Sequence, residues 1–259
     1  MTLKRCLILF YAGLAYLLSL AAIAYLVGFL ADFGVPKSVN GPGSEGSLSQ
    51  AILWNCLLVA GFGLHHSLTA RIRFKRWWTT IIPAHVERAT YLYMTTIATG
   101  LLVVLWQPIP LTVWRIASDS AAILIVVLYL GVWTAMFSAT FQIGHLGFFG
   151  LAPVLDKLFA RNPGPVPFAA RALYGLVRHP ISLGWMVVPW ITPHMTLGQL
   201  VFALATSAYV LIATVYEEND LIAELGDTYR RYQRQVPAFI PGLKPREREP
   251  GNPSLHRET

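Results

Sequence analysis

The chain has 259 residues, of which 55% are hydrophobic and only 13% are charged. A soluble domain carries about a quarter charged residues, so this composition excludes an ordinary soluble protein and indicates an integral membrane protein. The formal net charge of +7 is what basic loops on one side of a membrane produce, and it does not require a nucleic-acid partner.

Long apolar stretches follow one another along the chain, and each approaches or reaches the roughly 20 residues of a membrane-spanning helix. They cover residues 7–30, 51–68, 91–106, 121–141 and 200–216, and a shorter stretch covers residues 180–191. The first is too long for a signal peptide and no small-residue cleavage site follows it, so we expect a retained helix. The sequence therefore predicts an all-α polytopic membrane helix bundle of five to six membrane-embedded helices.

Basic residues are concentrated in alternate connections between these stretches. Residues 71–90 contain five lysines and arginines and residues 157–178 contain four, whereas residues 31–50 and 107–120 contain one each. Because lysine and arginine are enriched in cytoplasmic loops, this alternation predicts that both termini lie in the cytoplasm.

The chain turns polar after residue 216. Leu221, Leu225 and Tyr232 recur at near-helical spacing, which predicts a cytoplasmic amphipathic helix that ends near Gln235. Residues 242–259 are rich in proline and mixed charge and are predicted to be a disordered cytoplasmic tail. Residues 1–241 are then expected to form a single integral-membrane domain.

Two polar motifs flank the last apolar hairpin: Arg178-His179-Pro180 and Glu217-Glu218. Proline is well tolerated in the first turn of a helix, so Arg178 and His179 are expected at a helix N-terminus, where free amides and the side chains form an anion site. The hairpin returns the two glutamates to the same membrane face. A ligand with one carboxylate and one ammonium would satisfy both motifs.

The same residues also allow a simpler interpretation. Arg178 can serve as a cytoplasmic anchor of its helix, and the glutamate pair can serve to neutralise it at the membrane surface. Spacing alone does not decide between a ligand site and this structural role.

Several motifs resemble the C-terminal signature of the membrane methyltransferases related to isoprenylcysteine carboxyl and phospholipid N-methyltransferases. They are Arg178-His179-Pro180, Gly184, Glu217-Glu218, Leu221, Gly226, Tyr229, Tyr232 and Pro237. A second block resembles the NnrU-like membrane family, which includes the bacterial methanethiol S-methyltransferases. It comprises His66-Ser67-Leu68, Arg71, Phe74-Lys75, Trp78, Pro83, Glu87-Arg88 and Tyr91.

This resemblance implies S-adenosylmethionine (S-adenosyl-L-methionine) as methyl donor, bound on the cytoplasmic side, and a small thiol as acceptor, with methanethiol giving dimethyl sulfide. It assigns to the donor pocket Arg178, His179, Pro180, Gly184, Glu217, Glu218, Tyr229 and Tyr232. A thiol must lose its proton to become a nucleophile, and His145 and His179 are the candidate catalytic residues for that step. No metal is required. The expected location is a bacterial inner membrane, with the lipid bilayer as partner and the oligomeric state left open.

Some residues depart from the family pattern and leave the acceptor less certain than the donor. Ser182 stands where the family generally has tyrosine, Asn219 stands where arginine is common, and residues 147–153 lack the acidic and basic groups of the thiol branch. A larger lipid-like or prenylated acceptor is therefore an alternative. The pair His65-His66 can be an interfacial polar pair, part of a pocket, or a haem ligand, and the last option gives a third alternative, an NnrU-like haem protein or isomerase.

Overall fold

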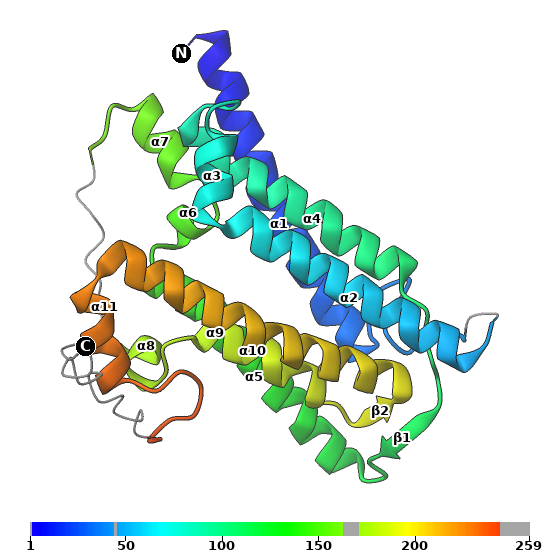
Figure 1. Cartoon of the computed structure of the whole chain (residues 1–259). Helices are drawn as coiled ribbons and strands as arrows, with labels where there is room; N and C mark the ends of the chain where they lie inside the picture. Colours follow the sequence, from blue (N-terminus) through cyan, green and yellow to red (C-terminus); the bar gives the residue numbers. More distant parts are fainter. Residues whose placement is uncertain (1, 44–45, 163–170, 244–259) are drawn as a thin grey trace, which may run out of the picture.

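A computed structural model of the chain describes residues 2–43, 46–162 and 171–243 (Figure 1). Most of the predicted tail, residues 244–259, lies outside the described residues. Five long helices form the bundle: α1 (Leu3–Ala31), α2 (Leu48–Ala70), α4 (Glu87–Leu105), α5 (Asp119–Gln142) and α10 (Leu197–Leu225). Each is long and apolar enough to cross a membrane, so the predicted all-α polytopic membrane bundle is confirmed.

Three of the long helices, α2, α5 and α10, begin a few residues before their apolar stretches and have a polar side chain that caps the first turn. The Ser47 hydroxyl accepts from the Gln50 backbone amide, and the Gln50 side chain accepts from the Ser47 amide, which completes a capping box at α2. Thr196 caps α10 in the same way, through the backbone amide of Gln199. Caps satisfy the first free amides of each helix and so extend it beyond its apolar part.

The sixth apolar stretch is not a continuous helix. It forms α9 (Pro180–Val187) and a single 3-10 turn, η2 (Val188–Trp190), and then continues as extended chain. The extended chain enters strand β2 (His194–Thr196), which pairs antiparallel with β1 (Thr112–Arg115). The chain thus returns across the bundle partly as helix and partly as extended backbone.

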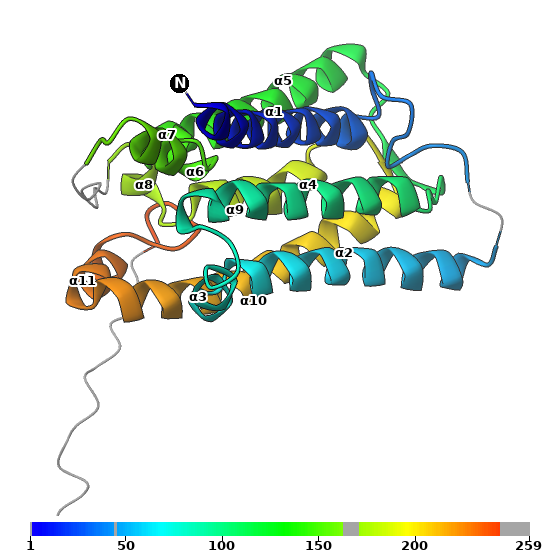
Figure 2. The same cartoon turned by 90° about the horizontal axis from the view of Figure 1, so that it is seen from above.

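The helices pack side by side, and their short partners gather at one end. Helix α4 packs on α1 and α2, α2 packs on α10, and α9 lies between α10 and α5. At the end that carries the N-terminus lie α3 (Ile72–Trp78), α6 (His145–Phe148), α7 (Ala152–Leu158), α8 (Leu173–Leu176) and α11 (Asp227–Gln235) (Figure 2). We call this end the site end, and the opposite end, with β1 and β2, the strand end.

A buried amide network closes the strand end. The Asn55 side chain bonds both backbone groups of Gln107, donating to the carbonyl at 2.7 Å and accepting from the amide at 3.0 Å. The Gln199 side chain is fully buried; it donates to the Leu30 and Pro189 carbonyls and accepts from Asn40. An open cavity of about 800 Å³ lies near this end, but none of the residues predicted to bind a ligand lines it.

The chain after Tyr216 differs from the prediction of one separate amphipathic helix. Helix α10 continues without a break to Leu225, the backbone turns at Gly226 with φ +56°, and α11 follows and ends at Gln235 as expected. With 29 residues, α10 is about 43 Å long, more than the roughly 30 Å of a bilayer core. Its last turns, which carry both glutamates, therefore extend beyond the apolar part of the helix.

Candidate functional site

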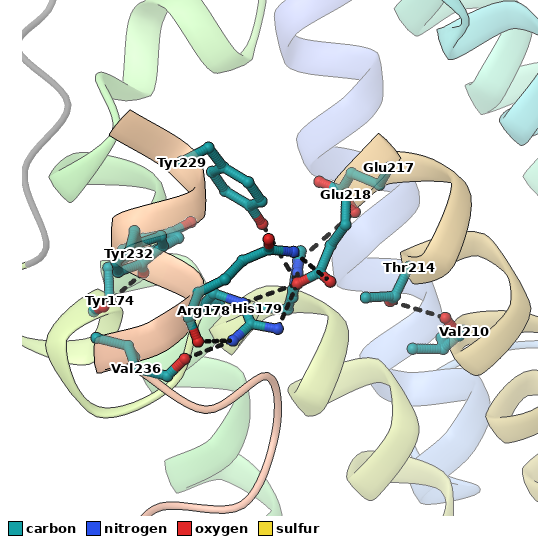
Figure 3. Close-up of polar contacts among 11 residues, drawn as sticks. Tyr174, Arg178, His179, Val210, Thr214, Glu217, Glu218, Tyr229, Tyr232 and Val236 are labelled. Atoms are coloured by element: carbon teal, nitrogen blue, oxygen red, sulfur yellow. Dashed lines mark hydrogen bonds and ion pairs between the residues drawn. The ribbon is translucent and has the colours of Figure 1, made fainter. Parts of the chain in front are cut away.

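The start of α9 is bound to the chain that follows α11. The backbone amide of Arg178 donates to the Pro237 carbonyl at 2.8 Å, and that of His179 donates to the Ala238 carbonyl at 3.2 Å. Pro180 occupies the first turn of α9, as its fixed φ favours. These contacts bring residues 178–180 beside the last turns of α10, which carry the glutamates (Figure 3).

Arg178 and Glu218 form the centre of the cluster. The Arg178 Nε and Nη2 atoms lie 2.7 Å and 2.6 Å from Glu218 Oε1. The Arg178 Nη1 atom donates to the backbone carbonyls of Gln233 and Val236, and the Gln233 side chain donates to Glu218 Oε2 at 3.0 Å. The Arg178 side chain is only 9% exposed, so this ion pair is well shielded from solvent.

These contacts change the interpretation of the arginine. The sequence predicts a guanidinium, an imidazole and free amides that together bind an anion, but the guanidinium already bonds a carboxylate and two carbonyls. The amides of Arg178 and His179 are also used, by Pro237 and Ala238. Arg178 therefore fixes the geometry of the cluster and is not an open anion-binding group.

His179 lies between the two glutamates. Its Nε2 is 3.0 Å from Glu218 Oε1, and its Nδ1 is 3.7 Å from Glu217 Oε2. The Glu218 side chain is 18% exposed, whereas that of Glu217 is 52% exposed. Glu217 is thus the carboxylate of this cluster that can receive a cation from outside.

Three tyrosines surround the carboxylates on the α8 and α11 side. The Tyr229 hydroxyl donates to Glu218 Oε1 at 3.4 Å, and the Tyr232 hydroxyl donates to the Tyr174 carbonyl at 2.6 Å. Burial raises the pKa of Tyr232 to about 12, and it also raises the pKa values of Tyr174 and Tyr229, with the nearby glutamate charge adding to the rise. All three phenols therefore remain protonated at neutral pH and can act as hydrogen-bond donors.

Close packing of α9 against α5 explains why residue 184 is a glycine. A Cβ atom at this position would collide with the side chain of Met136 on α5. The next residue, Trp185, meets Trp133 of α5 edge-on with ring centroids 5.1 Å apart. The glycine lets α9 approach α5 closely, one turn into the bundle from Arg178.

His145 lies in a different group of residues. Its ring stacks on Phe141 with centroids 4.2 Å apart, and its two nitrogens contact the hydroxyls of Tyr16 at 3.0 Å and Thr140 at 2.7 Å. Burial lowers the pKa of this imidazole. The structure thus brings seven of the predicted residues into one region with Gly184 just inside it, and places His145 in an aromatic cluster between α1 and α5.

Sequence reasoning missed several residues of the site. Gln233 and Tyr174 complete the hydrogen bonding of Glu218 and Tyr232, and Arg71, which lies between α2 and α3, forms an ion pair with Asp220 of α10 at 2.9 Å. Arg71 and Asp220 could have been paired from the sequence, because both lie where basic and acidic helix ends meet. Gln233 and Tyr174 have no comparable signal, since they act through contacts set by the path of the backbone.

Fold and site define a polytopic helical membrane protein with a carboxylate-rich, arginine-fixed site at one end of its bundle. No family model matches the chain, and no solved structure matches it. Methanethiol S-methyltransferase 2 of Bradyrhizobium diazoefficiens is 41% identical, over 94% of this chain and 93% of that protein. The methanethiol S-methyltransferases of Pseudomonas sp. GM41(2012) and Mycobacterium tuberculosis are 43% and 37% identical, over 90% and 92% of this chain and 89% and 97% of those proteins.

The chain therefore belongs to the methanethiol S-methyltransferase family, a family of methyltransferases. The resemblance to the bacterial methanethiol S-methyltransferases, drawn from the Arg-His-Pro and Glu-Glu motifs together with the block from His66 to Tyr91, is confirmed.

Proposed function

We propose that this protein transfers the methyl group of S-adenosylmethionine to methanethiol and releases dimethyl sulfide. The observation that carries the proposal is the accessible Glu217 carboxylate beside the shielded Arg178–Glu218 pair, in a chain that belongs to this family. An accessible carboxylate whose position is fixed before the donor arrives can bind a cationic methyl donor without reorganisation.

The residues fit that donor. S-adenosylmethionine carries an ammonium and a sulfonium, and it supplies a methyl group bonded to positively charged sulfur. Glu217 can bind the cationic end of the donor. Arg178, His179 and Glu218 hold Glu217 in place, and the Tyr229 hydroxyl supports Glu218 by donating to it. We assign to the donor pocket Arg178, His179, Pro180, Gly184, Glu217, Glu218, Tyr229 and Tyr232.

The protein's own contribution is alignment and proton removal. Holding two reactants in line in a site without water supplies several kcal/mol of the barrier. The thiol must be deprotonated, and His179 and His145 are the candidates from the sequence. His179 lies in the donor cluster, whereas His145 bonds Tyr16 and Thr140.

We place the site end on the cytoplasmic side of a bacterial inner membrane, with both termini there. The basic connections on either side of α3 and α8 support this orientation, because lysine and arginine favour the cytoplasmic face. A donor made in the cytoplasm would then reach the site directly. Residues 1–241 act as one membrane domain in this proposal.

The test is an assay on membranes that contain the protein, supplied with S-adenosylmethionine and methanethiol. Dimethyl sulfide is followed by gas chromatography, with the Glu218→Ala protein at equal amount as control. We expect product from the wild type and at least a hundredfold less from the variant. Intact binding of S-adenosylhomocysteine without any dimethyl sulfide would remove methanethiol as the acceptor and leave a methyltransferase for another substrate.

A further inference from the structure

His66 and Tyr91 form a polar contact between α2 and α4, outside the Arg178 cluster. The Tyr91 hydroxyl oxygen lies 3.0 Å from His66 Nε2 and 3.1 Å from His66 Nδ1. One hydroxyl can bond only one of these nitrogens at a time. Among the described residues neither nitrogen has a further hydrogen bond, so one ring nitrogen is left for a ligand.

The ring is held in a defined orientation before any ligand binds. Phe62 stacks on the His66 ring with centroids 5.6 Å apart and planes 18° apart. The Arg88 guanidinium lies 4.7 Å from the centre of the Tyr91 ring and donates to the Phe148 carbonyl at 2.9 Å. Each partner of the contact is thus oriented by a residue of its own helix, and Arg88 is in turn held by the Phe148 carbonyl of α6. Such fixed orientation favours a group that must meet a substrate.

The contact is next to the helix that carries the glutamates. Helix α2 packs against Tyr209 of α10. The Tyr209 ring fills the space that a Cβ on Gly63 would take, and the Tyr209 hydroxyl lies 3.2 Å from the Ser67 hydroxyl. Glu217 follows Tyr209 by about two turns on α10, and α2, which carries His66, packs on both α4 and α10. The His66–Tyr91 contact therefore lies on a helix that packs directly against the helix of Glu217.

Resting on the proposed function, we propose that His66, oriented by Tyr91, accepts the proton of the methyl-accepting thiol. The S–H bond breaks and its proton goes to the open ring nitrogen, while the electron pair left on sulfur forms the new S–CH3 bond. The pair of the broken methyl–sulfur bond stays on the donor's sulfur, which becomes a neutral thioether. The imidazolium then releases its proton to water.

The other histidines considered for this step are less available. His179 directs its nitrogens to Glu218 and Glu217, and His145 directs its nitrogens to Tyr16 and Thr140. Of the three, His66 has a nitrogen that no described residue occupies.

The experiment compares His66→Gln with the matched control His65→Gln, the neighbouring histidine on the same helix. Values of kcat/KM are measured for a series of thiols that runs from acidic aryl thiols to alkyl thiols, and S-adenosylhomocysteine binding is measured by calorimetry. We expect His66→Gln to lower kcat/KM for alkyl thiols about 10²- to 10⁴-fold, with a smaller loss for more acidic thiols and unchanged binding of S-adenosylhomocysteine. His65→Gln should resemble the wild type across the series.

A loss that is equal for all thiols would show a structural role and overturn the assignment, as would an unchanged His66→Gln enzyme. If His66→Gln does not fold, Tyr91→Phe takes its place, with an expected loss of about tenfold that again shrinks for acidic thiols. A wild-type protein that binds S-adenosylhomocysteine but methylates none of the thiols would overturn the proposed function itself.

Discussion

The guanidinium of Arg178 contacts a single oxygen of Glu218 twice, through Nε at 2.7 Å and through Nη2 at 2.6 Å. The other oxygen, Glu218 Oε2, accepts a hydrogen bond from the Gln233 side chain, and Glu217 takes no part in the Arg178–Glu218 ion pair. Two adjacent glutamates thus have different surroundings: Glu218 joins α9, α10 and α11, whereas Glu217 is exposed and is the carboxylate that we propose binds the donor. The difference leads to the first prediction.

Glu217→Gln and Glu218→Gln should separate binding from stability. Loss of the Glu217 charge removes a charge-assisted contact of about 1.5–3 kcal/mol, so S-adenosylhomocysteine should bind roughly 10- to 150-fold more weakly while the melting temperature stays unchanged. Glu218→Gln leaves the shielded Arg178 without its charged partner. It should therefore lower both the affinity for S-adenosylhomocysteine and the melting temperature. Calorimetry and thermal unfolding in detergent measure the two quantities. Equal effects of the two substitutions on stability would contradict this division of tasks.

Gly184→Ala should destabilise the protein by overpacking. The added methyl group meets the Met136 side chain, and forcing α9 away from α5 costs about 1–3 kcal/mol. The double variant Gly184→Ala with Met136→Ala should recover part of this loss, because the shorter side chain makes room. Thermal unfolding of the two single variants and the double variant gives the coupling. If the losses of stability in the two single variants simply add in the double variant, a collision with Met136 does not explain why residue 184 is glycine.

Tyr232→Phe should reduce the alkaline sensitivity of the fold. The pKa of Tyr232 is raised to about 12, so the folded state retains a proton that the unfolded chain loses near pH 10. Its contribution is therefore fully present below about pH 10 and is lost as the pH rises from about 10 to 12. Unfolding free energy measured across this range should fall less steeply for Tyr232→Phe than for the wild type, although the variant loses about 1 kcal/mol at neutral pH with the bond to Tyr174.

His145→Phe should reduce acid sensitivity. Burial lowers the pKa of His145 below its ordinary value of 6.5, so the folded state keeps the ring neutral where the unfolded chain binds a proton. This stability is present above pH 6.5 and is lost as the pH falls below it. Chemical unfolding at pH 5 and pH 7.5 should show a smaller difference for the variant. The folded variant should retain methyl transfer, because both nitrogens of His145 are bonded to Tyr16 and Thr140. Abolished transfer with intact donor binding would instead make His145 the thiol base and contradict the assignment to His66.

Much of the fold could be predicted because it depends on local sequence. The apolar stretches predicted the ends of the five long helices to within a few residues, except for the C-terminal end of α10, and the differences at α2 and α10 have local causes. A capping Ser47 lengthened α2, and the polar turns after Tyr216 continued α10 as far as the glycine at 226. Gly226, with a positive φ, was itself a signal for the break between α10 and α11.

The meeting of Arg178 with Glu218 could also be predicted, because a hairpin returns its two ends to one face. The saturation of Arg178 could not be predicted. Its partners include the carbonyls of Gln233 and Val236, and backbone atoms carry no residue-type signal. His145 shows the same limit: its position in sequence suggested chemistry, but its partner Tyr16 comes from a helix 129 residues away.

The amides that close the strand end have a mechanical consequence. Opening that end would expose the buried Gln199 and Asn55 side chains without their partners, at a cost of about 1–3 kcal/mol for each group. These hydrogen bonds hold the helices together near β1 and β2, so we expect the bundle to open more easily at the site end. Both substrates would then enter, and both products would leave, at that one end.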